Sequence, residues 1–211
     1  MMPPLLPDEA RALDAAAPVP LEFYDGRLRF HGAELPAGAR AGPGELERAL
    51  RAMTGGSPRH GELIVGVLAA LRAACRAGSG GCKTYTEVRV SLPDGRWVYP
   101  DAVVVCGGPV PPAHDPLGLV NPTVVVEVLS PSTEAVDRGE KFERLQALDA
   151  LQHYVLVHQA RARVEVYSRA GEAWVLRVAG PGGAARLNAL GAELPLDELY
   201  AGVELDPVDA A

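Results

Sequence analysis

Two apolar stretches, each with a single acid, decide the expected fold: residues 97–106 are WVYPDAVVVC and residues 123–130 are TVVVEVLS. Continuous β-branched runs of this length are typical of strands covered on both faces. An unpaired carboxylate in such a strand either costs several kcal/mol or takes up a proton. Asp101 and Glu127 therefore need a partner, and two acids on consecutive strands, followed by a lysine, predict a shared cation.

The size and composition of the chain indicate one domain. Its 211 residues, 48% of them hydrophobic, are enough for one well-formed core. No apolar run approaches the roughly 20 residues that span a bilayer, and the first residues lack the basic and apolar regions of a signal peptide. Three cysteines (Cys75, Cys82 and Cys106) fall in different expected elements. This odd, scattered set favours a reducing cytoplasm over a disulfide framework or a zinc site.

Charge gives two further indications. The formal net charge of −7 is unusual for a nucleic-acid-binding protein, because sequence-independent affinity for DNA comes mainly from Lys and Arg. A local basic groove is still compatible with this total. The candidates for it are Arg59, Arg72, Arg76, Arg89 and Arg96. Only two of the 20 basic residues are lysines, so the presence of a lysine and not an arginine at position 141 needs an explanation.

The hydrophobic periodicity predicts a mixed α/β (α+β) fold, a sheet flanked by helices. The expected elements are a hairpin over 21–30, a loop over 31–44, a helical turn over 45–53, a helix from 57 to about 76, a strand over 83–92, the strands 97–106 and 123–130, a helix from 130 to about 148, a strand over 153–157, a hairpin of 163–169 with 173–178, and a short helix near 196–200. Residues 1–20, rich in proline, and 204–211 are expected to be tails, which leaves 21–203 as a single domain.

The two acids suit a hard divalent cation. If the two strands pair, Asp101 and Glu127 face one another, and Mg2+ commonly takes one or two carboxylates together with water and phosphate oxygens. Such a metal can activate water and stabilise the charge of a phosphodiester in displacement. The alternative is that each acid lies at a strand edge and pairs with an arginine.

Three further residues are candidates for the site. Lys141 shares a helix face with apolar residues at i+4 and i+7, so it is expected to point at the sheet. The alternative is a solvated pair with Asp137. His60 follows a Ser-Pro helix start, where a phosphate contact and a merely packed histidine are both plausible. Glu22 is a weaker third acid, with a surface strand position as the expected interpretation.

Five segments, in this order and at these spacings, resemble the Uma-two family of restriction-endonuclease-like proteins. They are residues 53–60 (MTGGSPRH), 99–101 (YPD), 126–133 (VEVLSPST), 137–141 (DRGEK) and 154–157 (YVLV). The resemblance covers roughly residues 21–203. It implies a PD-(D/E)xK nuclease-like fold, with a mixed sheet between helices.

The resemblance also implies roles for individual residues. Asp101 and Glu127 match the metal-binding acids of the family, with Mg2+ or Mn2+ as the cofactor. The usual lysine two residues after the glutamate is replaced by Leu129, and Lys141 on the following helix matches the relocated lysine. His60 occupies the neighbourhood of another polar group. The chain departs from the family pattern at residues 25–27 (DGR), which weakens the case for Glu22.

The leading hypothesis is a cytoplasmic, metal-dependent endonuclease, with DNA as the expected substrate and Asp101, Glu127 and Lys141 as the catalytic residues. The alternative is a catalytically inactive nuclease fold that acts in binding or regulation, which the net charge favours. A two-carboxylate glycosidase has little support, because the chain offers only two tryptophans for a sugar platform. The apolar hairpin over 163–178 is a candidate surface for a homodimer.

Overall fold

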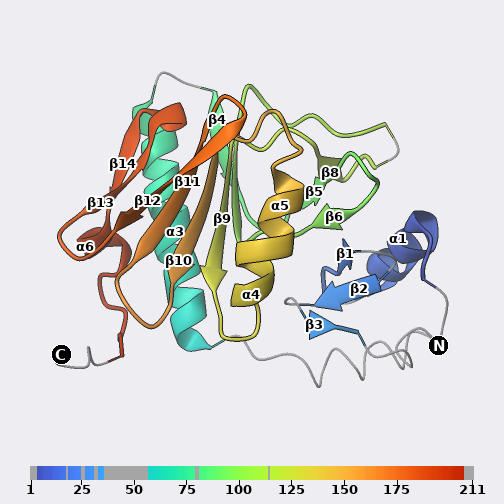
Figure 1. Ribbon diagram of the computed structural model, residues 1–211, viewed down its shortest axis with the longest axis horizontal. Coiled ribbons are helices and arrows are strands. Elements are labelled where there is room, and N and C mark those ends of the chain that lie inside the picture. The colour runs from blue at the N-terminus through green and yellow to red at the C-terminus, as the bar shows by residue number, and fades with distance from the viewer. Residues whose placement is uncertain are drawn as a thin grey trace.

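Two six-stranded sheets, a small third sheet and the helices around them make up the molecule (Figure 1). The computed structural model describes residues 4–17, 19–24, 27–30, 33–35, 57–78, 81–113 and 115–206. Its helices are α1 (Pro7–Ala16), α3 (Pro58–Ala77), α4 (Glu134–Val136), a π-helical segment (Asp137–Lys141), α5 (Phe142–Leu145), a 3-10 turn (Asn188–Leu190) and α6 (Leu196–Leu199). Its strands are β1 (Glu22–Tyr24), β2 (Arg27–Phe30), β3 (Ala33–Glu34), β4 (Cys82–Tyr85), β5 (Arg89–Ser91), β6 (Trp97–Val98), β7 (Ala102–Cys106), β8 (Gly118–Leu119), β9 (Val124–Leu129), β10 (His153–His158), β11 (Val164–Ala170), β12 (Ala173–Ala179), β13 (Ala184–Leu187) and β14 (Ala192–Pro195).

The main sheet has the strand order β12-β11-β10-β9-β7-β4 and is covered on both faces. Its parallel pair, β9 and β10, is joined through α4 and α5, as a parallel pair requires a crossover. Alternate residues of β9 face opposite ways: Val124 and Val126 pack in the cluster that contains α3, and Val125 packs with α5. The helices thus lie on opposite faces (Figure 1), and the expected sheet flanked by helices is confirmed.

The two acid-bearing strands are neighbours. β7 and β9 pair antiparallel, with Ala102 opposite Val126, so Asp101 at the entry of β7 comes next to Glu127. Both strands are buried on both faces, as the apolar runs predicted. Because residue 127 has the same parity as Val125, its side chain lies on the α5 face of the sheet.

The expected strands over 83–92 and 97–106 are each split between the two large sheets. β4 and β7 pair in the main sheet, whereas β5 and β6 pair in the second sheet. The break follows from the backbone: Pro100 has no N–H for a ladder, and Glu87 adopts a positive φ of 55°. One long hairpin therefore bends from one sheet into the other, and Asp101 lies just after the bend.

The second sheet, with the order β3-β2-β1-β6-β5-β8, carries the N-terminal part of the chain. The hairpin expected over 21–30 is confirmed as β1 and β2, with Tyr24 opposite Arg27. The expectation of a loose tail over 1–20 is wrong, because Pro7 opens α1 as a first helical residue and Ala10 packs in the apolar cluster with Trp97. β3 lies in the segment expected as a loop, and the helical turn expected over 45–53 lies outside the described residues.

The helix α3 begins where the sequence predicted. Ser57 caps α3, its Oγ accepting the His60 N–H at 3.2 Å, and Leu63 and Leu71 are buried against the sheet. The helix expected from 130 to about 148 is made of three parts, which run from Glu134 to Leu145. Its middle part is the π-helical segment, which includes Gly139 and has Lys141 as its last residue. Such wide turns occur often at functional sites.

Two further expectations from the sequence are wrong. Cys82 and Cys106 lie directly opposite on the neighbouring strands β4 and β7 and form a disulfide, which removes the sequence argument for a reducing compartment. The tail expected over 204–211 is in contact with the domain at Asp206. Asp206 N donates to Ala160 O at 3.0 Å, and the Asp206 carboxylate forms an ion pair with Arg59 at 2.8 Å.

The last elements form the small sheet of β13 and β14 and the short helix α6, of which only α6 was expected. β12 is an edge strand of the main sheet, and Val175, Leu176 and Val178 are 40–47% exposed on it. Within the described ranges, no helix is both long and apolar enough to cross a bilayer.

Candidate active site

Lys141 lies at the centre of a buried cluster of acids. Its Nζ is 2.7 Å from Glu22 Oε1, 2.8 Å from Glu127 Oε1 and 3.8 Å from Asp137 Oδ1. The predicted direction toward the sheet is confirmed, and the alternative of a solvated pair with Asp137 is wrong, because Lys141 is only 4% exposed. Three elements far apart in the sequence supply these groups: β1, β9 and the π-helical segment.

Glu22 is buried, not at the surface as expected. Its Oε1 also accepts the Tyr99 N–H at 3.1 Å. The reason is the pairing of β1 with β6, in which Phe23 lies opposite Trp97, so that Glu22 reaches the bend just before Asp101. A contact between segments this far apart in the chain has no local signal in the sequence.

Asp101 joins the cluster from the entry of β7. Its Oδ2 accepts the backbone N–H of Val128 at 2.7 Å, and its Oδ1 lies 3.6 Å from His60 Nε2. The ionisable side chains next to the two strand acids within the described residues are thus His60 and Lys141, and not the arginines that the alternative interpretation required. All five candidate residues from the sequence therefore meet in one place.

Negative charge exceeds positive charge in this cluster. Burial raises the pKa of Glu127 well above its usual range; the Lys141 charge opposes this shift, and the charge of Asp137 adds to it. Burial also raises the pKa of Asp137. Burial alone would lower the pKa of Lys141, but Glu127, Glu22 and Asp137 outweigh it and raise that pKa well above its usual value. One ammonium thus contacts three carboxylates, and Asp101 brings a fourth carboxylate close to Glu127.

The cluster contains two buried oxygens with no hydrogen-bond partner among the described residues: Glu127 Oε1 and the Tyr24 hydroxyl. The contact of Glu127 Oε1 with Lys141 has the distance of an ion pair without the angles of a hydrogen bond. Tyr24 is fully buried, and burial followed by the charge of Glu22 raises its pKa. An unsatisfied buried oxygen is unusual and marks a place for a water or an ion.

The donors suit a divalent cation that water helps to hold. Asp101 and Glu127 provide the one or two carboxylates that Mg2+ usually takes from a protein. In the part of the chain that the structure describes, no three His, Cys, Asp or Glu side chains are arranged as a closed metal cage. Water and substrate oxygens would therefore have to complete the coordination shell.

The sequence analysis missed three residues that shape the site. Asp137, expected only as a solvated partner of Lys141, is buried with it, and the helix face that the two residues share was a usable signal. The Tyr154 hydroxyl donates to the Asp137 carbonyl oxygen at 2.9 Å and so holds the π-helical segment against β10. Gln159 contacts both His60 and Leu129, and its position after β10 carries no signal in the sequence.

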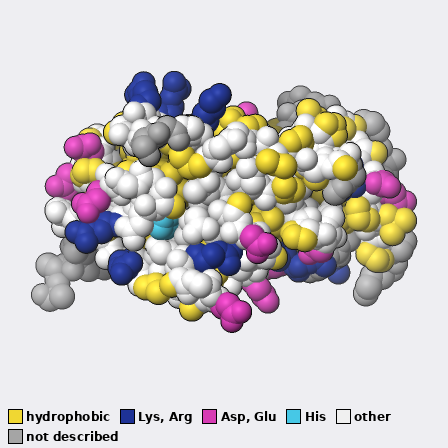
Figure 2. Space-filling view, turned by 90° about the horizontal axis from the view of Figure 1, so that it is seen from above, with side chains coloured by type: hydrophobic (Ala, Val, Ile, Leu, Met, Phe, Trp, Pro, Cys, Tyr) yellow, Lys and Arg dark blue, Asp and Glu magenta, His cyan; other side chains and the backbone are white. Residues whose placement is uncertain are grey.

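The basic groove proposed from five arginines does not form as expected. Arg89 is buried, where it pairs with Asp14 at 2.5 Å and Asp115 at 2.9 Å. Arg59 pairs with Asp206. On the face shown in Figure 2, the basic side chains of the described residues stand in separate groups with acidic ones between them.

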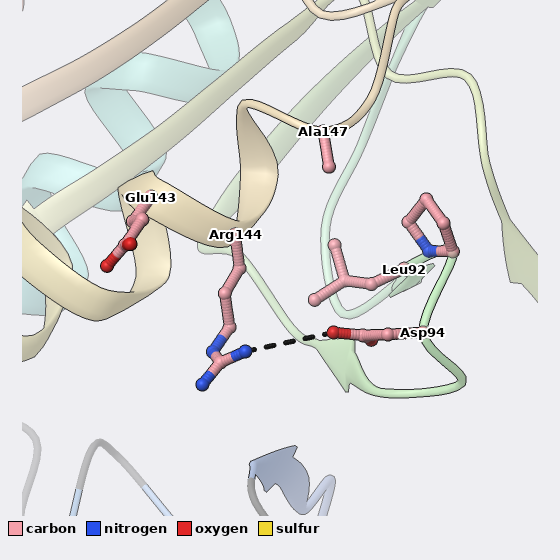
Figure 3. Close-up of a pocket in the computed structure, with 6 residues that line it drawn as sticks. Leu92, Asp94, Glu143, Arg144 and Ala147 are labelled. Carbon is pink, nitrogen blue, oxygen red and sulfur yellow. Dashed lines mark ion pairs between the residues drawn. The ribbon is translucent and has the colours of Figure 1, made fainter.

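Two hollows flank the candidate site. The first, about 290 Å³, lies beside α5, where Arg144 approaches Asp94 at 3.7 Å (Figure 3). The second, about 680 Å³, is lined by residues that include Ser57, Leu129 and Gln159, so it borders the His60 side of the site. Neither hollow is lined by the cluster acids themselves, which lie deeper.

Comparisons with known proteins agree with this architecture. A crystal structure from Anabaena variabilis ATCC 29413, described as "a putative nuclease belonging to DUF820", superposes with a TM-score of 0.68. The match covers 94% of this chain and 98% of that one at 14% sequence identity, which shows a shared fold.

Two proteins of Synechocystis sp. (strain ATCC 27184 / PCC 6803 / Kazusa) are similar in sequence. "Uncharacterized protein sll1609" is 33% identical over 81 residues, 38% of this chain and 46% of the relative's length. "Uncharacterized protein slr1290" is 28% identical over 161 residues, 72% of this chain and 80% of the relative. The Uma2 family model, described as "Putative restriction endonuclease", matches residues 46–206. Because this family model matches most of the chain, the chain belongs to the Uma2 family.

Proposed function

We propose that this protein is a nuclease that hydrolyses phosphodiester bonds of DNA with the help of Mg2+ or Mn2+. Membership of the Uma2 family and the fold shared with the Anabaena protein support a nuclease. The observation that carries the metal dependence is the charge balance of the site, where one buried ammonium lies among three carboxylates and Asp101 adds a fourth beside Glu127. A divalent cation would neutralise this excess.

Each residue of the cluster has a role in this proposal. Asp101 and Glu127 hold the metal, which when bound supplies Lewis-acid activation of water and of the phosphate. Lys141 orients the attacking water or stabilises the charge that develops on the phosphate. Glu22 holds the lysine ammonium at 2.7 Å, and His60 approaches Asp101 at 3.6 Å from α3. Glu22 and His60 are thus accessory groups that keep the three main residues in place.

Calorimetric titration of Mn2+ tests the metal site without a known substrate. We expect heat of binding for the unmodified protein and none for Asp101→Asn or Glu127→Gln. Glu172→Gln, an exposed acid in the turn between β11 and β12, is the matched control and should bind as the unmodified protein does. Metal-dependent cleavage of a DNA panel follows, and cleavage that survives both site substitutions would show that the assignment is wrong.

A non-catalytic binding module is the second candidate. The net charge of −7 and the burial of Arg89 in ion pairs favour it. The salt dependence of DNA binding separates the two, because phosphate contacts give a steep loss of affinity with salt. Binding that is absent or independent of salt for every nucleic acid tested would favour a protein partner.

A homodimer also forms part of the proposal. β12 is a seven-residue edge strand with three exposed apolar side chains, and unprotected edges of this kind pair with other strands. Analytical ultracentrifugation should give a dimer, and Leu176→Lys at the edge should shift it to monomer. A monomeric unmodified protein at high concentration would remove the dimer from the proposal.

A further inference from the structure

Gln159 links three parts of the site through one side chain. Its Oε1 accepts a hydrogen bond from Ser57 Oγ at 3.1 Å, at the start of α3. Its Nε2 lies 2.6 Å from the carbonyl oxygen of Leu129, at the end of β9, and 3.1 Å from His60 Nδ1. The amide therefore connects the loop after β10 with the helix that carries His60 and the strand that carries Glu127.

These contacts fix which end of the amide is the nitrogen. A carbonyl oxygen can only accept, so the atom 2.6 Å from Leu129 O must be the NH2 group. The reverse orientation would place two acceptor oxygens against each other at that distance. The NH2 group has two hydrogens, and the one that Leu129 does not use is available to His60 Nδ1 at 3.1 Å.

The amide orientation in turn fixes the imidazole. Because Gln159 donates to Nδ1, this nitrogen must carry the lone pair, and a neutral His60 keeps its hydrogen on Nε2. Nε2 is the atom that faces Asp101 Oδ1 at 3.6 Å. The ring thus presents an N–H toward the carboxylate and no lone pair.

We infer that Gln159 is a positioning residue that holds neutral His60 in the Nε2–H tautomer. This inference deepens the proposed nuclease function and rests on it for its meaning in catalysis. Held in this way, His60 is a hydrogen-bond donor to anionic oxygen, whether of Asp101 or of a substrate phosphate. It is neither a metal ligand through Nε2 nor the base that removes a proton from water.

The tautomer can be measured in the free protein by nitrogen NMR of isotope-labelled histidine. Spectra are recorded at rising pH until the ring signals no longer change, so that only the neutral ring is observed. The His60 signals are assigned by their loss in His60→Asn. We expect Nε2 to resonate as a protonated nitrogen and Nδ1 as an unprotonated one.

Substitutions of Gln159 should change this signature in two different ways. In Gln159→Leu the population ratio of the Nε2–H tautomer to the Nδ1–H tautomer should fall by roughly five- to tenfold, because the loss of one hydrogen bond changes a two-state ratio by about this factor. In Gln159→Glu a carboxylate oxygen cannot remain 2.6 Å from the Leu129 carbonyl oxygen, but an oxygen turned toward the ring accepts from Nδ1–H, so the hydrogen should move to Nδ1. Gln152→Leu is the matched control, because the Gln152 side chain donates to the nearby Asp149 carbonyl oxygen and has no contact with His60 among the described residues, and it should leave the His60 signals unchanged.

An Nδ1–H ring in the unmodified protein would overturn the inference, and so would an unchanged tautomer in both Gln159 variants. The readout needs neither metal nor DNA. Failure of the nuclease proposal would therefore leave the tautomer result standing, and loss of the tautomer preference would leave the roles of Asp101, Glu127 and Lys141 untouched.

Discussion

Replacing Lys141 by methionine removes the cation from the centre of the buried acids and keeps most of the length of the side chain. Glu22 and Glu127 would lose a partner at 2.7 and 2.8 Å, and Asp137 would lose one at 3.8 Å. The side chains of Glu127 and Asp137 are each 5% exposed, so water cannot replace the ammonium without rearrangement. The variant should therefore be less stable than the unmodified protein.

The size of the loss follows from the burial of the group. Removing one member of a buried ion pair costs about 3–5 kcal/mol, because it leaves an uncompensated charge. Glu22 keeps the Tyr99 N–H, so we expect the lower part of that range, about 3 kcal/mol. For a chain of 211 residues this corresponds to a melting temperature roughly 6–12 °C lower.

The loss should also depend on pH. Without the ammonium, the buried carboxylates of the folded variant hold protons to higher pH than those of the unfolded chain, so its stability falls as pH rises. The difference from the unmodified protein should therefore grow as pH rises above the ordinary range of carboxyl pKa values. Mn2+ should reduce the difference if it binds among the same acids.

Urea unfolding, followed by tryptophan fluorescence at several pH values, measures these effects. Lys83→Met is the matched control, since Lys83 is the other lysine of the chain and is exposed on β4. Its effect should stay within about 0.5 kcal/mol. A Lys141→Met variant that loses no more than this control, or a loss that does not change with pH, would refute the reasoning.

Three further outcomes are expected. Arg89→Met should lower the free energy of unfolding by about 3–5 kcal/mol, since it leaves two buried aspartates without their cation, whereas exposed Arg177→Met should change it little; equal effects in urea unfolding would contradict this. Burial lowers the pKa of His153 to about 4, so the unfolded chain takes up the proton first as pH falls, and stability of about 2–3 kcal/mol should be lost between pH 6.5 and pH 4. Urea unfolding of His153→Gln should show a smaller loss over this range, and an unchanged pH profile would contradict the assignment. Reduction of the Cys82–Cys106 disulfide should cost about 3 kcal/mol for a sequence separation of 24, which calorimetry with and without a dithiol would detect; an unchanged transition would count against it.

Much of the fold could be predicted because its signals are local. The β-branched runs of β7 and β9, the Ser-Pro start of α3 and the apolar spacing around Lys141 each depend on neighbouring residues alone. The pairing of Asp101 with Glu127 followed once two adjacent apolar runs were taken as neighbouring strands. The occurrence of an acid within an apolar, β-branched strand was itself the signal for the candidate active site.

What could not be predicted depends on contacts between distant segments. The N-terminal residues contain prolines that favour a tail, and α1 is stabilised there by packing against Trp97 and by the Asp14–Arg89 ion pair. Cys82 and Cys106 became partners through the register of β4 with β7.

The sequence was enough to identify the two strand acids, the lysine and the family, because each is marked by residue type and short spacing. The position of Glu22 against the lysine, and of Gln159 against His60, came from the folded chain. Both contacts arise where β1 meets β6 and where α3 meets the end of β10, and such meetings are set by the sum of many weak packing interactions. No single segment of the sequence encodes them.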